Sequence, residues 1–322
     1  MFTSLLQCCV SRNAPISESQ PREERKEFLL KNENWMSDYQ SKRVLDLWVI
    51  PGTHHSGVVR PKKRVSQAVW GWAQTQEASI YEQLKFGIRF LDLRVRVSKG
   101  QVILSHGLSS DIRLETALED IKSFLSTHST EFVLVYVRAD KWHEMTAECV
   151  KNVREALIAS KVSFFPAIDS LASIKVGDLA GKALYFSPDV TIPKCTWRTD
   201  LLAYCDVWQE TSIEEAQKRI SNYMESIRER TNSDGALSGV ALDGAFPVKQ
   251  QCYTSKELNE WFLKNLKTNK EWSGLRTLGL CIIDFATEEF VDQLLKLNKA
   301  AKTVRISEPG ERKTINKRSV AG

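Results

Sequence analysis

Hydrophobic residues alternate along the chain between two kinds of segment. Short runs rich in Val, Ile, Leu and Phe are typical of buried strands, whereas longer segments with apolar residues three and four positions apart are typical of amphipathic helices. The strand-like runs are residues 44–50, 90–97, 102–106, 132–138, 183–186, 203–208, 239–242 and 278–283. The helix-like segments are residues 79–86, 114–127, 146–160, 213–230, 255–264 and 288–297. Strands that alternate with helices predict an α/β fold, and eight strands favour a TIM-type (β/α)8 barrel over an open sheet.

The two ends of the chain lack this pattern. We therefore predict a single catalytic domain over residues 29–300, a flexible N-terminal tail over residues 1–28, and a basic C-terminal tail over residues 301–322. The seven cysteines contain no Cys-x-x-Cys spacing, which favours free thiols in a reducing compartment. Cys8 and Cys9 are adjacent in an apolar stretch, so they are either part of an ordinary unstructured terminus or sites of S-acylation.

Charge and hydropathy exclude several classes of protein. The net charge of +5 comes almost entirely from the last 22 residues, where six Lys and Arg face two Glu, and the rest of the chain carries only +1. A body so close to neutral has no general field for polyanions, so we expect no nucleic-acid partner. No apolar run reaches the roughly 18 to 20 residues of a membrane span, and the N-terminus does not resemble a secretory signal. We therefore expect a cytoplasmic protein without a transmembrane segment.

Chemically useful side chains follow the strand-like runs. In a TIM-type barrel the active site gathers at the carboxyl ends of the strands. The residues found at or just beyond these runs are His54, Asp92, Arg94, His106, Arg138 and Asp284. Because buried charges must be paired, and because Asp92 and Arg94 are two positions apart on one strand and so share a face, we expect these residues to form one cluster.

This set of residues suits acid and base chemistry on a phosphodiester. A histidine can accept a proton and another can donate one near neutral pH, and a carboxylate on the second ring nitrogen orients each imidazole. We therefore expect one aspartate for each histidine, with His54 as the base and His106 as the acid. Arg94 would bind the anionic oxygen, and Arg138 would be a second anion contact. With an arginine to neutralise the charge of the phosphate, the set can do this chemistry without a metal ion, so we predict no metal and no cofactor.

Four segments, in order, resemble the phosphatidylinositol-specific phospholipase C family. They are residues 50–57 (IPGTHHSG), 69–76 (VWGWAQTQ), 87–94 (GIRFLDLR) and 104–107 (LSHG), and the resemblance extends from Trp35 to Asn298. It is strongest to the calcium-independent proteins that contain a single X domain. The resemblance implies an incomplete TIM barrel, a general base at His54, a general acid at His106, and supporting aspartates at Asp92 and Asp284.

The resemblance also implies the reaction and its partners. In this family the inositol 2-hydroxyl attacks the phosphodiester, which releases diacylglycerol and leaves inositol 1,2-cyclic phosphate. Arg94 occupies the position of a calcium-binding acid in the calcium-dependent relatives, so we expect no metal requirement. The implied partner is an inositol phospholipid in a membrane surface, either phosphatidylinositol or a glycosylated relative. The residues themselves add a membrane-facing surface: Trp72 and the basic loop 60–64, near the expected site, would contact anionic lipid head groups, which predicts peripheral membrane association. Trp70 is either part of this surface or a tryptophan of the core.

One residue departs from the family pattern. His55 stands where the bacterial motif usually has an aspartate that pairs with the arginine, which puts the rate in doubt more than the mechanism. A catalytically weak lipid-binding adaptor on the same fold is therefore one alternative. A metal-dependent glycerophosphodiesterase on a related barrel is another, although it would need clustered acidic ligands that the strand ends do not supply.

Overall fold

The computed structural model describes residues 32–59, 70–140, 145–205, 212–227, 235–243, 251–272, 275 and 277–306. Four features named above lie outside these residues: Cys8, Cys9, the basic loop 60–64 and residues 307–322 of the C-terminal tail.

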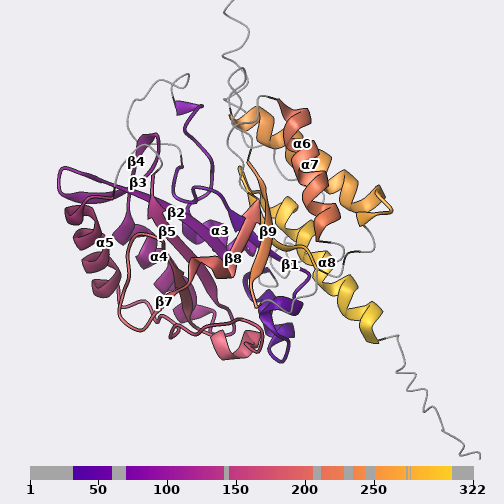
Figure 1. Ribbon diagram of the computed structural model, residues 1–322, viewed down its shortest axis with the longest axis horizontal. Helices are drawn as coiled ribbons and strands as arrows, with labels where there is room; N and C mark the ends of the chain where they lie inside the picture. The colour runs from indigo at the N-terminus through magenta and orange to yellow at the C-terminus, as the bar shows by residue number, and fades with distance from the viewer. Residues whose placement is uncertain are drawn as a thin grey trace, which may run out of the picture.

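Eight parallel strands form one curled sheet (Figure 1). They are β1 (Val49–Thr53), β2 (Phe90–Ser98), β5 (Val133–Ala139), β6 (Ala183–Phe186), β7 (Thr196–Trp197), β8 (Leu202–Cys205), β9 (Leu237–Leu242) and β10 (Gly279–Ile283). Their order across the sheet is β7-β6-β5-β2-β1-β10-β9-β8. Among the described strands β7 and β8 are not paired with each other, so the barrel is open between them. The predicted TIM-type fold and its incomplete form are both confirmed.

Six α-helices cover the sheet. They are α3 (Ile80–Phe86), α4 (Leu114–Thr127), α5 (Ala147–Ala159), α6 (Ile213–Ser226), α7 (Gln251–Thr268) and α8 (Glu288–Ile306). Neighbouring helices contact each other in the order α5-α4-α3-α8-α7-α6, and Figure 1 shows α6, α7 and α8 on one flank and α4 and α5 on the other. Ser79 begins α3 with a capping box, and Thr146 caps α5. These side chains accept hydrogen bonds from backbone N–H groups that the first turn leaves unpaired, which explains why the sequence pattern places both starts correctly.

Three predictions for individual helices and strands are wrong. The run 44–50 is not one strand, because residues Val44–Asp46 form a 3-10 helix whose apolar side chains pack beneath the barrel and β1 begins only at Val49. The run 102–106 is a strand, β3 (Gln101–His106), but it pairs antiparallel with β2 and with β4 (Leu108–Arg113). It is therefore a side excursion and not a barrel strand. At the other end, α8 continues to Ile306, beyond the predicted helix end at residue 297.

The turn between β2 and β3 explains the excursion. Lys99 and Gly100 both have positive φ, 52° and 73°, which reverses the chain tightly. The reversed strand carries its last residue, His106, back toward the middle of β2.

The amino ends of the strands are closed by a buried ion pair. Nη2 of Arg89 lies 2.6 Å from Oε2 of Glu131, and neither side chain is exposed. Trp35 of the 3-10 helix Trp35–Tyr39 donates its indole N–H to the carbonyl of Gly87 and so holds the first described residues against this end. The remaining 3-10 helices are Val176–Leu179 and Thr199–Leu201.

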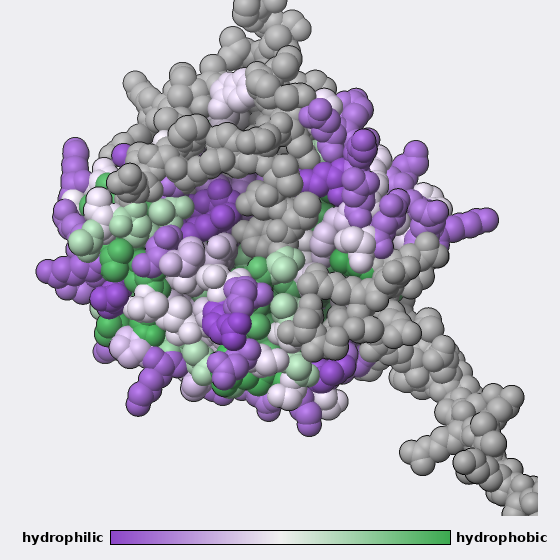
Figure 2. Space-filling model, in the orientation of Figure 1, coloured by the Kyte–Doolittle hydropathy of each residue, from purple (hydrophilic) through white to green (hydrophobic). Residues whose placement is uncertain are grey.

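The described surface mixes hydrophilic and hydrophobic side chains. On the face seen in Figure 2 the coloured residues show small hydrophobic areas between projecting hydrophilic side chains. Within the described part of the chain, no helix is long and apolar enough to cross a membrane.

Candidate active site

His54 and Asp284 lie side by side at the carboxyl ends of two neighbouring strands. Strands β1 and β10 are in register with Thr53 opposite Ile283, and each functional residue follows directly. Nδ1 of His54 lies 3.0 Å from Oδ1 of Asp284, and both side chains are buried. Because a carboxylate only accepts, Nδ1 of His54 carries the proton of this bond and Nε2 is the basic nitrogen. The pair therefore has the orientation that sequence reasoning expects for a general base.

Gln76 fixes the two strand ends relative to each other. Its side-chain N–H groups donate to the carbonyls of His54 and Ile283, and its carbonyl accepts from the backbone N–H of Ala286. Asn259 of α7 donates to the carbonyl of Asp284. One amide side chain thus ties the segment that carries the histidine to the segment that carries its carboxylate.

His106 reaches the site from the antiparallel strand β3. Its Nδ1 lies 3.0 Å from the carbonyl oxygen of Ala73, which is the acceptor that orients the ring. The expectation of one aspartate for each histidine is therefore wrong for His106. The sequence could not reveal this, because a backbone carbonyl leaves no residue-type signal and Ala73 belongs to a separate loop.

Asp92 pairs with two arginines instead. Its Oδ2 accepts from Nε of Arg94 at 3.1 Å, and its Oδ1 accepts from Nε of Arg138 at 3.4 Å. Arg94 and Arg138 are opposite each other on β2 and β5, so the carboxylate lies between two guanidinium groups. The structure thus brings Arg138 into the cluster, as expected, and gives Asp92 the task of holding both arginines.

His55 is buried between the two other histidines. Its ring centroid lies 4.4 Å from that of His54 and 4.1 Å from that of His106, whereas His54 and His106 are 5.9 Å apart. Nδ1 of His55 donates to the carbonyl of Ser105 at 2.9 Å. Nε2 is buried and has no hydrogen-bond partner among the described residues. The site therefore holds three imidazoles, and each orients its Nδ1 toward a carboxylate or a backbone carbonyl.

The environment moves the pKa values of the three imidazoles apart. Burial lowers the pKa of His54, but the charge and hydrogen bond of Asp284 outweigh it, and the pKa is raised above its ordinary value. Burial, followed by the Arg94 charge, lowers the pKa of His55 well below its ordinary value. Burial and the neighbouring His54 also lower the pKa of His106. Of the three imidazoles, His54 is therefore the one whose protonated form the surroundings favour.

Asp92 remains ionised for an electrostatic reason. Burial raises the pKa of this carboxyl, but the charges of Arg94 and Arg138 outweigh burial, and the pKa is lowered far below its ordinary value. The two arginines and the aspartate carry a net charge of +1, so this part of the site attracts an anion.

Two further carboxylates at the same end of the barrel are absent from the sequence-based set. Asp140, directly after β5, accepts from Oγ of Ser105 and from the backbone N–H of Gly107, both at 2.9 Å, and so holds the residues on either side of His106. Asp243, directly after β9, pairs with Arg219 at 3.2 Å and contributes to the raised pKa of His54. The strand-end rule that selected Asp284 would have selected both.

Metal-binding capacity within the described residues is concentrated in one group. One ligand atom each from His54, His55 and Asp92 lies within 4.8 Å of the others. Two histidines and one aspartate differ from the cluster of Asp and Glu ligands that a metal-dependent glycerophosphodiesterase would need.

The tryptophans of the loop before α3 differ in exposure. Trp70 is buried, so it packs in the interior and does not contact a membrane, whereas 44% of Trp72 is exposed. Trp72 adjoins Ala73, whose carbonyl orients His106. Trp72 is therefore an exposed aromatic residue beside the loop that orients His106.

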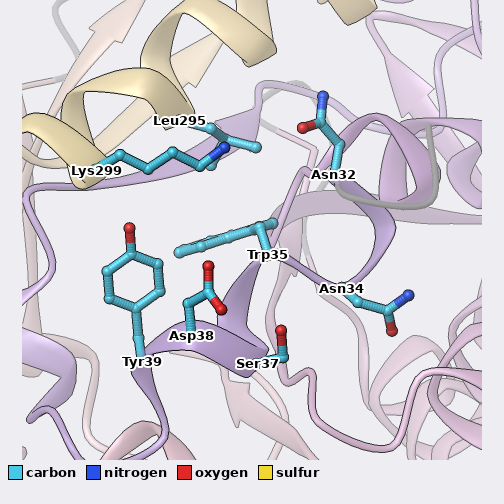
Figure 3. A pocket seen from close by; sticks show the side chains of 8 residues that line it. All are labelled: Asn32, Asn34, Trp35, Ser37, Asp38, Tyr39, Leu295 and Lys299. Carbon is cyan, nitrogen blue, oxygen red and sulfur yellow. The ribbon is translucent and has the colours of Figure 1, made fainter. Parts of the chain in front are cut away.

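A cavity of about 250 Å³ lies elsewhere (Figure 3). It is lined by Trp35 and Tyr39 together with Leu295 and Lys299 of α8. Trp35 bonds to Gly87 before β2, so the cavity belongs to the amino ends of the strands and not to the histidine cluster.

Comparison with known proteins finds a family model that matches part of the chain. Residues 50–186 match the family model described as "Phosphatidylinositol-specific phospholipase C, X domain". A PI-PLC X-box domain-containing protein of Dictyostelium discoideum is 29% identical over 173 residues, which cover 48% of this chain and 23% of that protein. A 1-phosphatidylinositol phosphodiesterase of Staphylococcus aureus is 34% identical over 110 residues, 34% of each protein. The matches thus span about a quarter to a third of the length of these two relatives.

A bacterial relative matches over most of its length. The 1-phosphatidylinositol phosphodiesterase of Listeria monocytogenes is 24% identical over 284 residues, which cover 82% of this chain and 84% of that protein. The solved structure of the phosphatidylinositol-specific phospholipase C from Listeria monocytogenes has a TM-score of 0.67 at 22% identity, and covers 82% of this chain and 98% of that one. At this identity the structural likeness establishes the fold.

Proposed function

Because residues 50–186 of this chain match the X-domain model of the phosphatidylinositol-specific phospholipase C family, we propose that the protein is a phospholipase C-like phosphodiesterase that cleaves phosphatidylinositol or a glycosylated relative. The observation that carries this proposal is the His54–Asp284 pair, 3.0 Å apart at the strand ends, with His106 and two arginines beside it.

The proposed reaction needs one base, one acid and one anion site. Nε2 of His54 removes the proton from the inositol 2-hydroxyl, whose oxygen attacks the phosphorus. The bond from phosphorus to the diacylglycerol oxygen breaks, and Nε2 of His106 donates a proton to that oxygen. The products are diacylglycerol and inositol 1,2-cyclic phosphate. Asp284 stabilises the imidazolium that forms on His54, as the carboxylate of a catalytic triad does.

Arg94 supplies the positive charge in this proposal. Its guanidinium is held by Asp92, and its planar fork of N–H donors has the geometry that suits phosphate oxygens, while Arg138 is a second cation opposite Arg94 on the neighbouring strand. We propose that these charges stabilise the negative charge that builds up on the phosphate, so that the reaction needs no metal ion.

In the free site the pKa shifts of the two histidines oppose their proposed roles. The pKa of His54, the base, is raised, and the pKa of His106, the acid, is lowered. The surroundings of the free site therefore disfavour the reactive form, in which His54 is neutral and His106 is protonated. An anionic phosphodiester beside His106 favours its protonated state, so substrate itself shifts the site toward the reactive form.

Membrane contact is the second part of the proposal. Trp72 is the exposed aromatic residue beside the loop that orients His106. Tryptophan has an apolar ring and a polar N–H, which suits the head-group region of a bilayer. We propose that the protein associates peripherally with an anionic membrane from the cytoplasm and that Trp72 enters the interface.

A vesicle assay tests the function. The protein is incubated in EDTA with vesicles that contain phosphatidylinositol, its phosphorylated forms or its glycosylated forms, and the release of each head group is measured. We expect release from the first or third kind of vesicle, and abolition by His54→Ala. Loss of activity in EDTA that calcium or magnesium restores would refute the metal-independent mechanism.

The adaptor alternative has one observation in its favour, the imidazole of His55 where the family pattern has a carboxylate. Full binding to phosphatidylinositol vesicles without any head-group release by the wild-type protein would support the adaptor over the enzyme.

A further inference from the structure

His55 is the residue of the site that the proposed reaction leaves without a task. Its backbone has a φ of 40°, its side chain is 1% exposed, and its Nε2 is buried without a partner among the described residues. Leaving a buried polar atom without a partner is unfavourable. Such an atom, held in place by a hydrogen bond on the other ring nitrogen, is a preorganised ligand.

Two neighbours complete a ligand set. His54 and Asp92 each present a ligand atom within 4.8 Å of the others and of His55. The set comes from the turn after β1 and from β2, which are neighbours in the middle of the sheet. Asp92 is shared with the arginines: its Oδ2 accepts from Arg94, and its Oδ1 accepts from Nε of Arg138 at 3.4 Å, so an ion on Oδ1 competes with Arg138 for this carboxylate.

The second shell of this set matches that of metal-bound histidines. A histidine that binds a metal usually donates its other ring N–H to a carboxylate or a backbone carbonyl. Nδ1 of His54 donates to Asp284, and Nδ1 of His55 donates to the carbonyl of Ser105. Both bonds leave Nε2 to coordinate an ion, and they fix the two rings.

The ligand types determine the class of ion. Two imidazoles and one carboxylate suit divalent ions of the zinc, cobalt and copper class, whereas calcium and magnesium need six or more oxygen ligands. We propose that His54, His55 and Asp92 bind one such transition-metal ion, and that the bound ion reversibly inhibits the phosphodiesterase.

Inhibition follows from the identity of the ligands, and this part of the inference rests on the proposed function. A metal on Nε2 of His54 occupies the lone pair that would accept the proton of the attacking hydroxyl. It also draws on the carboxylate that holds Arg94 and Arg138. Metal binding and base catalysis are therefore mutually exclusive at this nitrogen.

A cobalt titration tests binding without any use of activity. Co²⁺ is added to the purified full-length protein and the visible absorption of coordinated cobalt is recorded, with Zn²⁺ added afterwards as a competitor. We expect one Co²⁺ per chain and displacement by Zn²⁺. His55→Asn should weaken binding by about 100-fold or more, because loss of an outer-shell partner alone costs 10- to 100-fold. Asn tolerates the positive φ, and His55→Gln is a second variant should the first fail to fold.

His106→Ala is the matched control. It removes one imidazole from the same site but none of the three ligands, so it should bind Co²⁺ as the wild type does. Absence of coordinated cobalt in the wild type, or equal affinity in folded His55 variants, would overturn the metal site.

Inhibition is measured separately as the ratio of head-group release with and without Zn²⁺. We expect a low ratio for the wild type, recovery on addition of EDTA, and a ratio near one for His55→Asn whatever its own rate. An increase in rate with Zn²⁺ would overturn the inhibitory role. Cobalt binding in a protein that releases no head group with or without metal would refute the proposed function while supporting the metal site.

Discussion

Asp284→Asn separates the charge of the residue from its shape. Nδ1 of His54 lies 3.0 Å from Oδ1 of Asp284, and the two side chains are 7% and 0% exposed, so solvent screens this pair little. Asn keeps an oxygen that can accept from Nδ1 but removes the negative charge. The variant therefore tests whether the charge stabilises the imidazolium that the proposed reaction forms on His54.

The expected loss follows from the electrostatics. Opposite unit charges about 4 Å apart attract by about 4 kcal/mol at an effective dielectric constant of about 20, which corresponds to about 10³-fold in rate. A loss of about 10² to 10⁴ in kcat is therefore expected, in line with the effect of the same change in a catalytic triad. The pKa of His54 should also fall, because burial continues to lower it once the opposing charge is gone.

The assay is the pH dependence of kcat/KM for head-group release. In the wild type the rate rises with pH as His54 loses its proton, since its pKa is raised. In Asp284→Asn this acidic limb should move to lower pH while the plateau falls, so the deficit is largest at the alkaline end. Asp243→Asn is the control: this carboxylate also raises the pKa of His54 but is paired with Arg219, so its removal should move the limb less. A loss of less than about fivefold in kcat, or an unmoved acidic limb, would refute the reasoning.

Three further variants test other parts of the molecule. Asp140→Asn weakens two hydrogen bonds beside His106, each worth about 1.5 to 3 kcal/mol when charge-assisted. The kcat for head-group release should therefore fall about 10-fold or more with little change in KM, and an equal rise in KM would contradict a positioning role. Trp72→Ala should weaken binding to anionic vesicles about fivefold, because a half-exposed aromatic side chain contributes about 1 kcal/mol at the interface, while turnover of a soluble phosphodiester substrate stays constant; a matching loss of soluble turnover would refute the interfacial role. Gly279→Ala should lower the free energy of unfolding by about 1 to 3 kcal/mol, because φ is 76° and a Cβ would lie 2.1 Å from a backbone oxygen. Gly100→Ala, where φ is 73° but the space around a Cβ is open, should lower it less in the same denaturant titration. Equal losses would show that the positive φ alone matters.

Local sequence signals predicted much of the fold. The runs 183–186 and 114–127 match β6 and α4 to the residue, and the caps Ser79 and Thr146 mark the starts of α3 and α5. Each of these elements is specified by its own residues: apolar periodicity sets the buried face, and a capping side chain sets the first turn.

Long-range pairing limited the rest of the prediction. An apolar run such as 102–106 has the same composition in a barrel strand and in an antiparallel excursion, and only the turn at Lys99 and Gly100 distinguishes them. In the run 44–50, Val44 and Leu45 are buried in a 3-10 helix, whereas Val49 and Ile50 begin β1, so burial was correctly inferred but the conformation of the first residues was not.

For the candidate site, too, the residues were predictable from local signals but their partners were not. The strand-end rule found His54, Asp284 and the two arginines, because β1, β2, β5 and β10 are true neighbours in the barrel. It failed to assign partners, because hydrogen bonds such as that from His106 to Ala73 join segments more than 30 residues apart through backbone atoms. Pairing of Asp92 with both arginines likewise depends on the register of β2 and β5.

The identity of the first phosphorus-containing product tests the central claim most directly. Wild-type protein in EDTA is mixed with phosphatidylinositol vesicles, and the reaction is followed by phosphorus NMR. The proposed attack by the inositol 2-hydroxyl, with His54 as base and His106 as acid, predicts that inositol 1,2-cyclic phosphate appears before any acyclic phosphate. Acyclic inositol phosphate as the first product, or turnover only after a divalent metal is added, would contradict it.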